Sequence, residues 1–244
     1  MGDAQGRVRA EPGNKRVRTY LGGHLVADTT RPLLVWESPR YPTYYLPEED
    51  VRATLEATGT TERSPSRGTA EIFDVRVGGH VAARSASAYR DPAIDSLRGH
   101  VRLDWQSMDA WFEEDEEVFV HPRDPYTRVD ALRSTRHVVV ELGGEVLADS
   151  HAPVILYETG HPPRHYLPAT DVRRDLLIPS DRVTHCPYKG STTYFHVRVG
   201  DREEEDLAWS YPTPLAESLP IAGMVCFPAE RVDITVDGQR HEPS

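Results

Sequence analysis

The stretch that decides the fold is residues 142–158, LGGEVLADSHAPVILYE, because residues 21–37, LGGHLVADTTRPLLVWE, repeat it 121 positions earlier. In both stretches a pair of glycines separates two segments of alternating apolar residues, which is the pattern of a β-hairpin. A short apolar run then follows at 33–36 and at 154–157, and its length favours a buried strand over a helix. The sequence therefore predicts the same strand-rich unit twice.

The repeat extends far beyond this stretch, so it represents a tandem duplication. The matches include 45–47 with 166–168 and 50–52 with 171–173. After one inserted residue they continue, with 75–78 matching 197–200. A repeat of about 100 residues is an ordinary domain size. We predict the following organisation: a flexible N-terminus at 1–14, a diverged first repeat at 15–120, a linker at 121–134 and a second repeat at 135–240.

The fold class predicted from these patterns is mainly β. Each repeat is expected to form a compact barrel-like or sandwich-like β unit with one or two short helices, including one at 48–57 that ends before Gly59 and one after Pro168. On the strand around residue 196, alternation places Phe195 on one face and Tyr194 and His196 on the other. No strand–helix–strand alternation runs along the chain, which disfavours a doubly wound nucleotide-binding sheet.

The composition excludes several classes of partner. The 244 residues contain 28 Lys and Arg against 39 Asp and Glu, a net charge of −11, so neither nucleic acid nor an anionic membrane is an expected partner. Cys186 and Cys226 cannot form a disulfide framework, and both are expected to be unpaired, with Cys186 at least partly buried. No apolar run approaches the roughly 20 residues that span a bilayer, and the polar start differs from a signal peptide. We expect a cytoplasmic protein.

Four short motifs in the second repeat resemble a known family. They are YLP at 166–168, DVR at 171–173, CPYKG at 186–190 and AWSYP at 208–212. In this order and spacing they resemble the family catalogued as domain of unknown function 427, and the first repeat resembles a divergent member, so the chain is similar to the tandem subclass. The resemblance implies a compact, mainly β unit with a strongly bent sheet. It implies no established activity, although the family sometimes has a nucleotidyltransferase-like label.

The sequence does not support phosphoryl transfer or a metal centre. It contains neither G-x-x-x-x-G-K-[ST] nor G-x-G-x-x-G, and residues 187–190 place one lysine beside one glycine, which is not a phosphate cradle. The spacing of His185, Cys186, His196 and Cys226 fits no zinc pattern. We therefore predict no metal and no cofactor.

Differences between the two repeats select candidate functional residues, because residues shared by both serve the common fold. Lys189 is one of only two lysines and corresponds to Arg67. It is either a base or Schiff-base nucleophile, or a surface lysine in a turn whose Gly190 needs positive φ. Cys186, which corresponds to Ser64, is either a stabilised thiolate or a small buried cysteine.

The other candidates lie near Lys189 or correspond to shared positions. Glu158 is either an ion-pair partner of Arg173 or a general base, and His196 is either a proton shuttle or an exposed strand residue. Trp209 either lines a pocket wall or lies in the core. The predicted catalytic residues are Lys189, Tyr194, Glu158 and Cys186. The predicted ligand-binding residues are Trp209, Tyr211, Tyr166, Arg173, His196 and Tyr188.

These candidates predict a cytosolic protein that binds a small molecule in the second repeat. One interpretation is an enzyme that applies acid–base or lysine-centred chemistry to a small polar metabolite; the alternative is a non-catalytic ligand-binding or protein-interaction module. Convergence of Lys189 Nζ, Glu158 and Tyr194 in a concave pocket would favour the enzyme. With Lys189 at a pocket edge, its replacement by Ala should cost little stability, and Arg67→Ala should leave function near wild type. The sequence predicts no oligomeric state.

Overall fold

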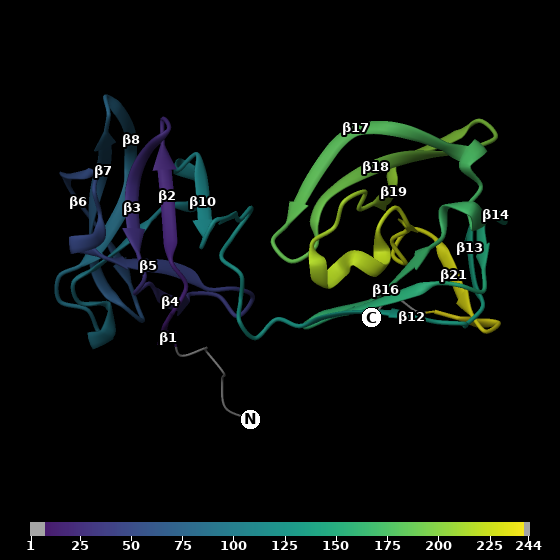
Figure 1. Ribbon diagram of the computed structural model, residues 1–244, viewed down its shortest axis with the longest axis horizontal. Helices are drawn as coiled ribbons and strands as arrows, with labels where there is room; N and C mark the ends of the chain where they lie inside the picture. Colours follow the sequence, from purple (N-terminus) through teal and green to yellow (C-terminus); the bar gives the residue numbers. More distant parts are fainter. Residues whose placement is uncertain (1–7, 242–244) are drawn as a thin grey trace. The chain divides into compact units, whose positions relative to one another are not determined.

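The chain forms two compact units of nearly equal size. The computed structural model describes residues 8–241, and the units divide between Asp124 and Pro125. The division falls inside the segment 121–134 that was predicted to join the repeats. Each unit contains one seven-stranded and one four-stranded antiparallel sheet (Figure 1), so the predicted mainly β, duplicated architecture is confirmed.

The larger sheet of the first unit has the order β1-β4-β5-β9-β8-β7-β6. In that order its strands are Arg9–Pro12, Leu33–Trp36, Thr43–Pro47, His100–Leu103, His80–Tyr89, Gly68–Val77 and Thr54–Ser64. The smaller sheet has the order β11-β10-β2-β3. Its strands are Glu116–Glu117, Ala110–Glu113, Val17–Leu21 and His24–Thr29.

The second unit repeats this topology strand for strand. Its larger sheet has the order β12-β15-β16-β20-β19-β18-β17, formed by Val129–Arg133, Val154–Glu158, His161–Leu167, Val225–Cys226, Arg202–Ser210, Gly190–Val199 and Leu177–Cys186. Its smaller sheet has the order β14-β13-β21-β22, formed by Glu145–Ser150, Val138–Leu142, Asp233–Val236 and Gln239–Arg240.

The two sheets of each unit pack face to face around one main core. In the second unit the apolar face of β13, with Val138 and Val140, packs against Val197 and Leu207 of the larger sheet. The predicted glycine hairpin is confirmed at the start of each unit, and both of its glycines have positive φ, at +60° and +87° for Gly143 and Gly144. Two successive residues with positive φ match the right-handed twist of the flanking strands.

Wide bulges bend the larger sheet. Between the pairs Pro179–Phe195 and Val183–Thr193, three residues of β17 lie opposite the single residue Tyr194 of β18. Three residues of β19 likewise lie opposite residue 196, on the other side of β18. Extra residues on a strand force it to curve, and Figure 1 shows β17 and β18 as strongly curved strands.

The two bulges of the second unit are joined across β18. Ser180, in the bulge of β17, donates a hydrogen bond of 2.6 Å from its hydroxyl to Asp206, in the bulge of β19. The first unit has the same two register shifts, on β6 and on β8. The bent sheet implied by the family resemblance is therefore built from features that both repeats share.

One helix prediction was wrong. Residues 48–57 do not form a helix: only the 3-10 turn η1 (Glu48–Asp50) forms, and β6 already begins at Thr54, pairing with β7. The helical segments among residues 8–241 are 3-10 turns, which comprise η1, η2 (Asp95–Leu97), η3 (Trp105–Ser107), η4 (Ala169–Asp171), η5 (Arg174–Leu176) and η6 (Ala216–Ile221).

The first strand of each unit was missed. β1 lies within the segment 1–14 that was predicted to be flexible, of which residues 1–7 fall outside the described residues, and β12 lies within the predicted linker. Both strands are sheet edges and pair antiparallel, β1 with β4 and β12 with β15. Edge strands bury little apolar surface, so hydrophobic periodicity does not reveal them.

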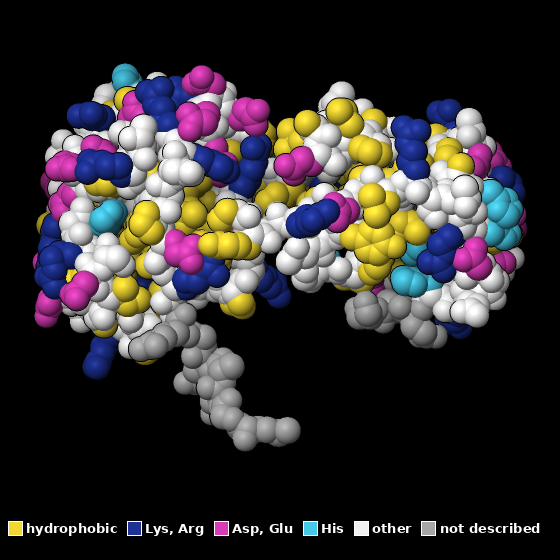
Figure 2. All heavy atoms as spheres, turned by 60° about the horizontal axis from the view of Figure 1, so that its bottom comes forward, with side chains coloured by type: hydrophobic (Ala, Val, Ile, Leu, Met, Phe, Trp, Pro, Cys, Tyr) yellow, Lys and Arg dark blue, Asp and Glu magenta, His cyan; other side chains and the backbone are white. Residues whose placement is uncertain are grey.

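The surface is charged and mixed. Figure 2 shows basic and acidic side chains interspersed over the visible face of each unit. Among residues 8–241, no helix has the length and apolar character needed to cross a bilayer.

Candidate functional site

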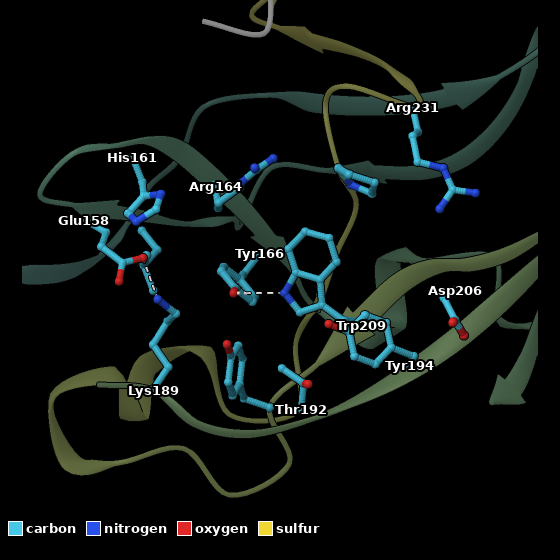
Figure 3. A pocket seen from close by; sticks show the side chains of 13 residues that line it. Glu158, His161, Arg164, Tyr166, Lys189, Thr192, Tyr194, Asp206, Trp209 and Arg231 are labelled. Carbon is cyan, nitrogen blue, oxygen red and sulfur yellow. Dashed lines mark hydrogen bonds and ion pairs between the residues drawn. The ribbon is translucent and has the colours of Figure 1, made fainter. Parts of the chain in front are cut away.

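A pocket of about 360 Å³ lies in the second unit, against the larger sheet (Figure 3). Its wall is aromatic because of the sheet register. Tyr194, Trp209, Cys226 and Tyr166 occupy one row across the four neighbouring strands β18, β19, β20 and β16, and the three aromatic members of that row line the pocket with Tyr211. The volume is within the range of small-molecule sites.

An ion pair forms one end of this pocket. The Nζ of Lys189 lies 2.5 Å from Oε2 of Glu158, and the two side chains are only 10% and 13% exposed. Glu158 ends β15, and Lys189 lies in the turn before β18. Gly190 permits that turn with φ of +97°, and the amide of Leu215 donates to the Lys189 carbonyl at 3.1 Å. The backbone therefore fixes the lysine at the pocket.

The phenols of the wall are neutral and partly engaged. Burial raises the pKa of both Tyr166 and Tyr211, so neither ionises near neutrality. The indole Nε1 of Trp209 donates to the hydroxyl of Tyr166 at 3.2 Å (Figure 3). The hydroxyl of Tyr194 lies 2.9 Å from the hydroxyl of Thr184. These bonds lock the orientation of the aromatic rings.

Further charged groups line the pocket, and each has a protein partner. Arg164 forms two hydrogen bonds to Glu230, at 2.9 and 3.0 Å, and its guanidinium carbon lies 5.9 Å from the ring centre of Trp209. Asp206 accepts from Ser180, a bond that lowers the pKa of its carboxyl. Charge in this pocket is therefore largely compensated.

His196 holds the bulge of β19 and does not line the pocket. The backbone N–H of Asp206, a residue with φ of +49°, donates to Nδ1 of His196 at 3.1 Å. In the first unit the amide of Arg84, with φ of +52°, donates in the same way to Asp74 at 2.7 Å. The same strained position is thus satisfied by a side chain of different type in each repeat, which gives His196 a structural role.

The structure brings together six of the ten predicted site residues. Those that line the pocket are Glu158, Lys189, Tyr194, Tyr166, Trp209 and Tyr211. Those outside its lining are Cys186, Tyr188, His196 and Arg173. Tyr194 shares the pocket with Lys189 but forms its hydroxyl contact with Thr184, so the three-residue convergence that would favour an enzyme is limited to the ion pair.

The expected partnership of Glu158 with Arg173 is wrong. Arg173 pairs with Asp175 at 2.7 Å and with Glu145 at 3.2 Å, since both acids lie close to it on the surface. The cysteine prediction is confirmed: Cys186 is half-buried, Cys226 is fully buried, and both are free. The zinc prediction concerned His185, His196 and the two cysteines. Among residues 8–241 these four do not form a metal-ligating group.

Several lining residues were not predicted. They are Leu156, His161, Arg164, Thr192, Asp206, Pro228 and Arg231. Thr192 had a usable signal, since it lies two residues before Tyr194 on one strand and therefore shares its face. The others come from strands and loops whose contribution depends on how the sheet bends.

The first unit has a reduced version of the same site. Its pocket is about 100 Å³, and the equivalent row reads Ile72, Ser87, Arg102 and Tyr45. An ion pair is present here too, with Arg67 Nη1 2.7 Å from Glu37 Oε1. The pair is thus common to both units, whereas Tyr194 and Trp209 of the aromatic wall have the non-aromatic counterparts Ile72 and Ser87 in the first.

Comparison with known proteins agrees with this duplication. The sequence model of one family, described as a domain of unknown function (DUF427), matches residues 9–114 and again residues 130–238. No curated protein matches the chain. The two matched segments cover most of the sequence and coincide with the two structural units. The chain belongs to the domain of unknown function 427 family, with two copies of the domain in tandem.

Proposed function

We propose that the second unit binds a small planar molecule with a hydrogen-bond donor and an acceptor side by side on one edge, as in an amide. The observation that supports this proposal is the difference in how the two units treat the same carboxylate. In the first unit three protein groups converge on one oxygen of Glu37; in the second, Glu158 has one side-chain partner among residues 8–241 and faces a larger pocket.

The three groups around Glu37 all contact the same oxygen. Its Oε1 accepts from the Tyr45 hydroxyl at 2.6 Å and lies 2.7 Å from Arg67 and 3.7 Å from Arg102. In the row across the larger sheet, Arg102 also occupies the position that Cys226 takes in the second unit, where the pocket is larger. The first unit therefore supplies its own cationic and hydroxyl groups where a ligand would otherwise lie.

The second unit has no equivalent of the Arg102 guanidinium, and its equivalent of the Tyr45 hydroxyl has a different partner. Cys226 replaces Arg102 in the row, and the hydroxyl of Tyr166 accepts from Trp209. Among residues 8–241, the carboxylate of Glu158 accepts one side-chain hydrogen bond, from Lys189 to Oε2. Its other oxygen is available to a ligand donor, and the ammonium of Lys189 has hydrogens left for a ligand acceptor.

The chemistry of the ligand follows from these groups. The Glu158–Lys189 pair has no net charge, which favours a neutral edge containing one donor and one acceptor. The walls formed by Tyr166, Trp209 and Tyr211 favour a flat, unsaturated body, because aromatic side chains stack on planar groups. A planar amide such as benzamide or 2-pyridone satisfies both conditions.

The same geometry disfavours covalent lysine chemistry. A Schiff-base nucleophile must be an unprotonated amine, and Lys189 instead donates a hydrogen bond, as an ammonium, to a carboxylate 2.5 Å away. Acid–base chemistry at the open oxygen of Glu158 remains the catalytic alternative. Recovery of a bound ligand unchanged after long incubation separates binding from turnover.

The test is ligand-observed NMR with matched probe pairs. Benzamide and 2-pyridone should bind, and N,N-dimethylbenzamide and N-methyl-2-pyridone, which lack the donor, should bind at least tenfold more weakly. Glu158→Gln should weaken the binding of benzamide by a similar factor, since an amide cannot replace the carboxylate against the ammonium. Glu37→Gln in the first unit is the matched control and should leave binding unchanged. Equal binding of the donor-blocked probes, or equal effects of the two substitutions, would contradict the proposal.

A further inference from the structure

A second cluster of chemically active side chains lies on the smaller sheet of the second unit, formed by His137, Asp149 and His151. Val138 pairs with Ser150 across β13 and β14, so His137 and His151, one residue further out on each strand, face each other. Their rings are parallel, with centres 4.1 Å apart and planes 11° apart. Asp149 lies two residues before His151 on the same face, with Oδ1 2.6 Å from His137 Nε2.

The cluster faces solvent. On β13 the buried side chains are those of Val138, Val140 and Leu142, which leaves the alternate face outward. Asp149 and His151 are exposed and His137 is half-buried. One potential ligand atom from each side chain lies within 4.8 Å of the other two. An ion could therefore reach all three groups directly from solution.

The equivalent positions of the first unit contain no histidine. The equivalent positions are Arg16, Asp28 and Thr30, and Arg16 forms a two-pronged pair with Asp28 at 2.8 and 2.6 Å. The acid is thus retained in both units. Its cationic partner and the opposite residue both become histidine in the second unit, so two independent positions change to metal-ligating residues at one spot.

We infer that His137, Asp149 and His151 form a binding site for a divalent transition-metal ion of the zinc type. Two imidazole nitrogens and one carboxylate oxygen are a ligand set typical of zinc sites that keep an open position for water. Imidazole ligands favour zinc, copper or nickel over magnesium or calcium. The site is separate from the pocket, because none of its residues lines the pocket.

The required rearrangement is small. Ligand atoms about 2.0–2.1 Å from a tetrahedral zinc ion lie about 3.3 Å from one another, compared with separations of up to 4.8 Å in the structure. Rotation of exposed side chains can close this gap without moving the backbone. The nearby cation Arg136 is held by Asp237 at 2.7 Å, so its charge is balanced by a neighbouring carboxylate.

The experiment is a titration of tag-free full-length protein with Zn²⁺ by isothermal calorimetry, and with Co²⁺ by visible absorption. The wild type should bind one equivalent of Zn²⁺ with Kd below about 0.1 mM, and the Co²⁺ spectrum should show bands from nitrogen ligation. His151→Thr should weaken Zn²⁺ binding at least tenfold. The double variant His137→Arg, His151→Thr rebuilds the first-unit ion pair, so it should keep the fold by circular dichroism while losing the site.

The matched control is His80→Ala in the first unit. His80 also neighbours a histidine, His24, with ring centres 5.8 Å apart, but this pair is not part of a three-residue metal-ligating group among residues 8–241. Zn²⁺ binding should be unchanged in this variant. A wild type that does not bind Zn²⁺, or a folded double variant that binds it as tightly as the wild type, would overturn the inference.

Discussion

Removal of the ammonium of Lys189 should cost the second unit more stability than removal of the guanidinium of Arg67 costs the first. The two residues occupy equivalent places and pair with equivalent carboxylates, at 2.5 and 2.7 Å. Without Arg67, Glu37 retains the Tyr45 hydroxyl at 2.6 Å. Among residues 8–241 no hydroxyl donates to Glu158, so Lys189→Met leaves a largely buried carboxylate without a cation there.

The expected size of the effect follows from burial. Breaking a fully buried ion pair costs about 3–5 kcal/mol, and an exposed pair contributes about 0–1 kcal/mol. The Lys189 and Glu158 side chains are 10% and 13% exposed and adjoin a pocket that water can enter, so we expect about 2 kcal/mol for Lys189→Met. For Arg67→Met we expect about 1 kcal/mol, because the Arg67 and Glu37 side chains are 18% and 21% exposed. This expectation is larger than the small cost predicted from the sequence, because the Lys189 side chain is only 10% exposed.

Urea unfolding measures these changes as shifts of the transition midpoint at constant m-value. Amide hydrogen exchange assigns each change to its unit. The double variant Lys189→Met, Glu158→Gln should recover most of the loss, because it removes the unpaired charge, and the resulting cycle gives the coupling energy of the pair. A coupling below about 0.5 kcal/mol, or a larger loss for Arg67→Met than for Lys189→Met, would refute the reasoning.

Three further outcomes are expected. Burial lowers the pKa of His165 from 6.5 to about 4, so between these two pH values His165 is protonated in the unfolded chain and neutral in the folded one. Stability should then fall by about 1.4 kcal/mol per pH unit as the pH drops from 6.5 towards 4, and urea unfolding of His165→Leu should show a flatter profile. A thiol reagent should modify Cys186 in the folded protein and Cys226 only after unfolding, because Cys226 is fully buried and its thiol pKa is raised; equal reaction rates would contradict this. Gly190→Ala should lower stability by about 1–3 kcal/mol because φ is +97° there, and should also weaken benzamide binding, whereas Gly68→Ala, with φ of +102°, should affect stability alone.

Local sequence signals predicted the parts of the fold that local chemistry determines. The glycine pairs at 22–23 and 143–144 require positive φ, and the apolar runs after them require burial, so the hairpins and the inner strands were found. The segment 48–57 contains helix-favouring residues, but pairing of Thr54 and its successors with β7 overrides that preference. The edge strands β1 and β12 bury too little apolar surface to produce a periodic signal.

The candidate site was predicted where residue type alone was informative. Lys189 stood out because lysine is rare in this chain, and Trp209 because its counterpart Ser87 is small. Glu158 and Lys189 were both predicted for the site, but their ion pair was not, since they are 31 residues apart in sequence and meet only after the sheet has bent. For the same reason His196 was expected in the site, although its ring supports the bulge of β19.

The bulges also constrain how this domain can change in length. Each places three residues opposite one, so it adds two residues to its strand, and an addition of two leaves the alternation of inward and outward side chains intact. Loss of a single residue from the bulge of β19 would rotate the remainder of the strand by half a period. Trp209 would then exchange faces with Ser210, and the aromatic row would be broken. Insertions and deletions in these strands are therefore tolerated in pairs, whereas the hairpin tip at 200–201 can change length one residue at a time.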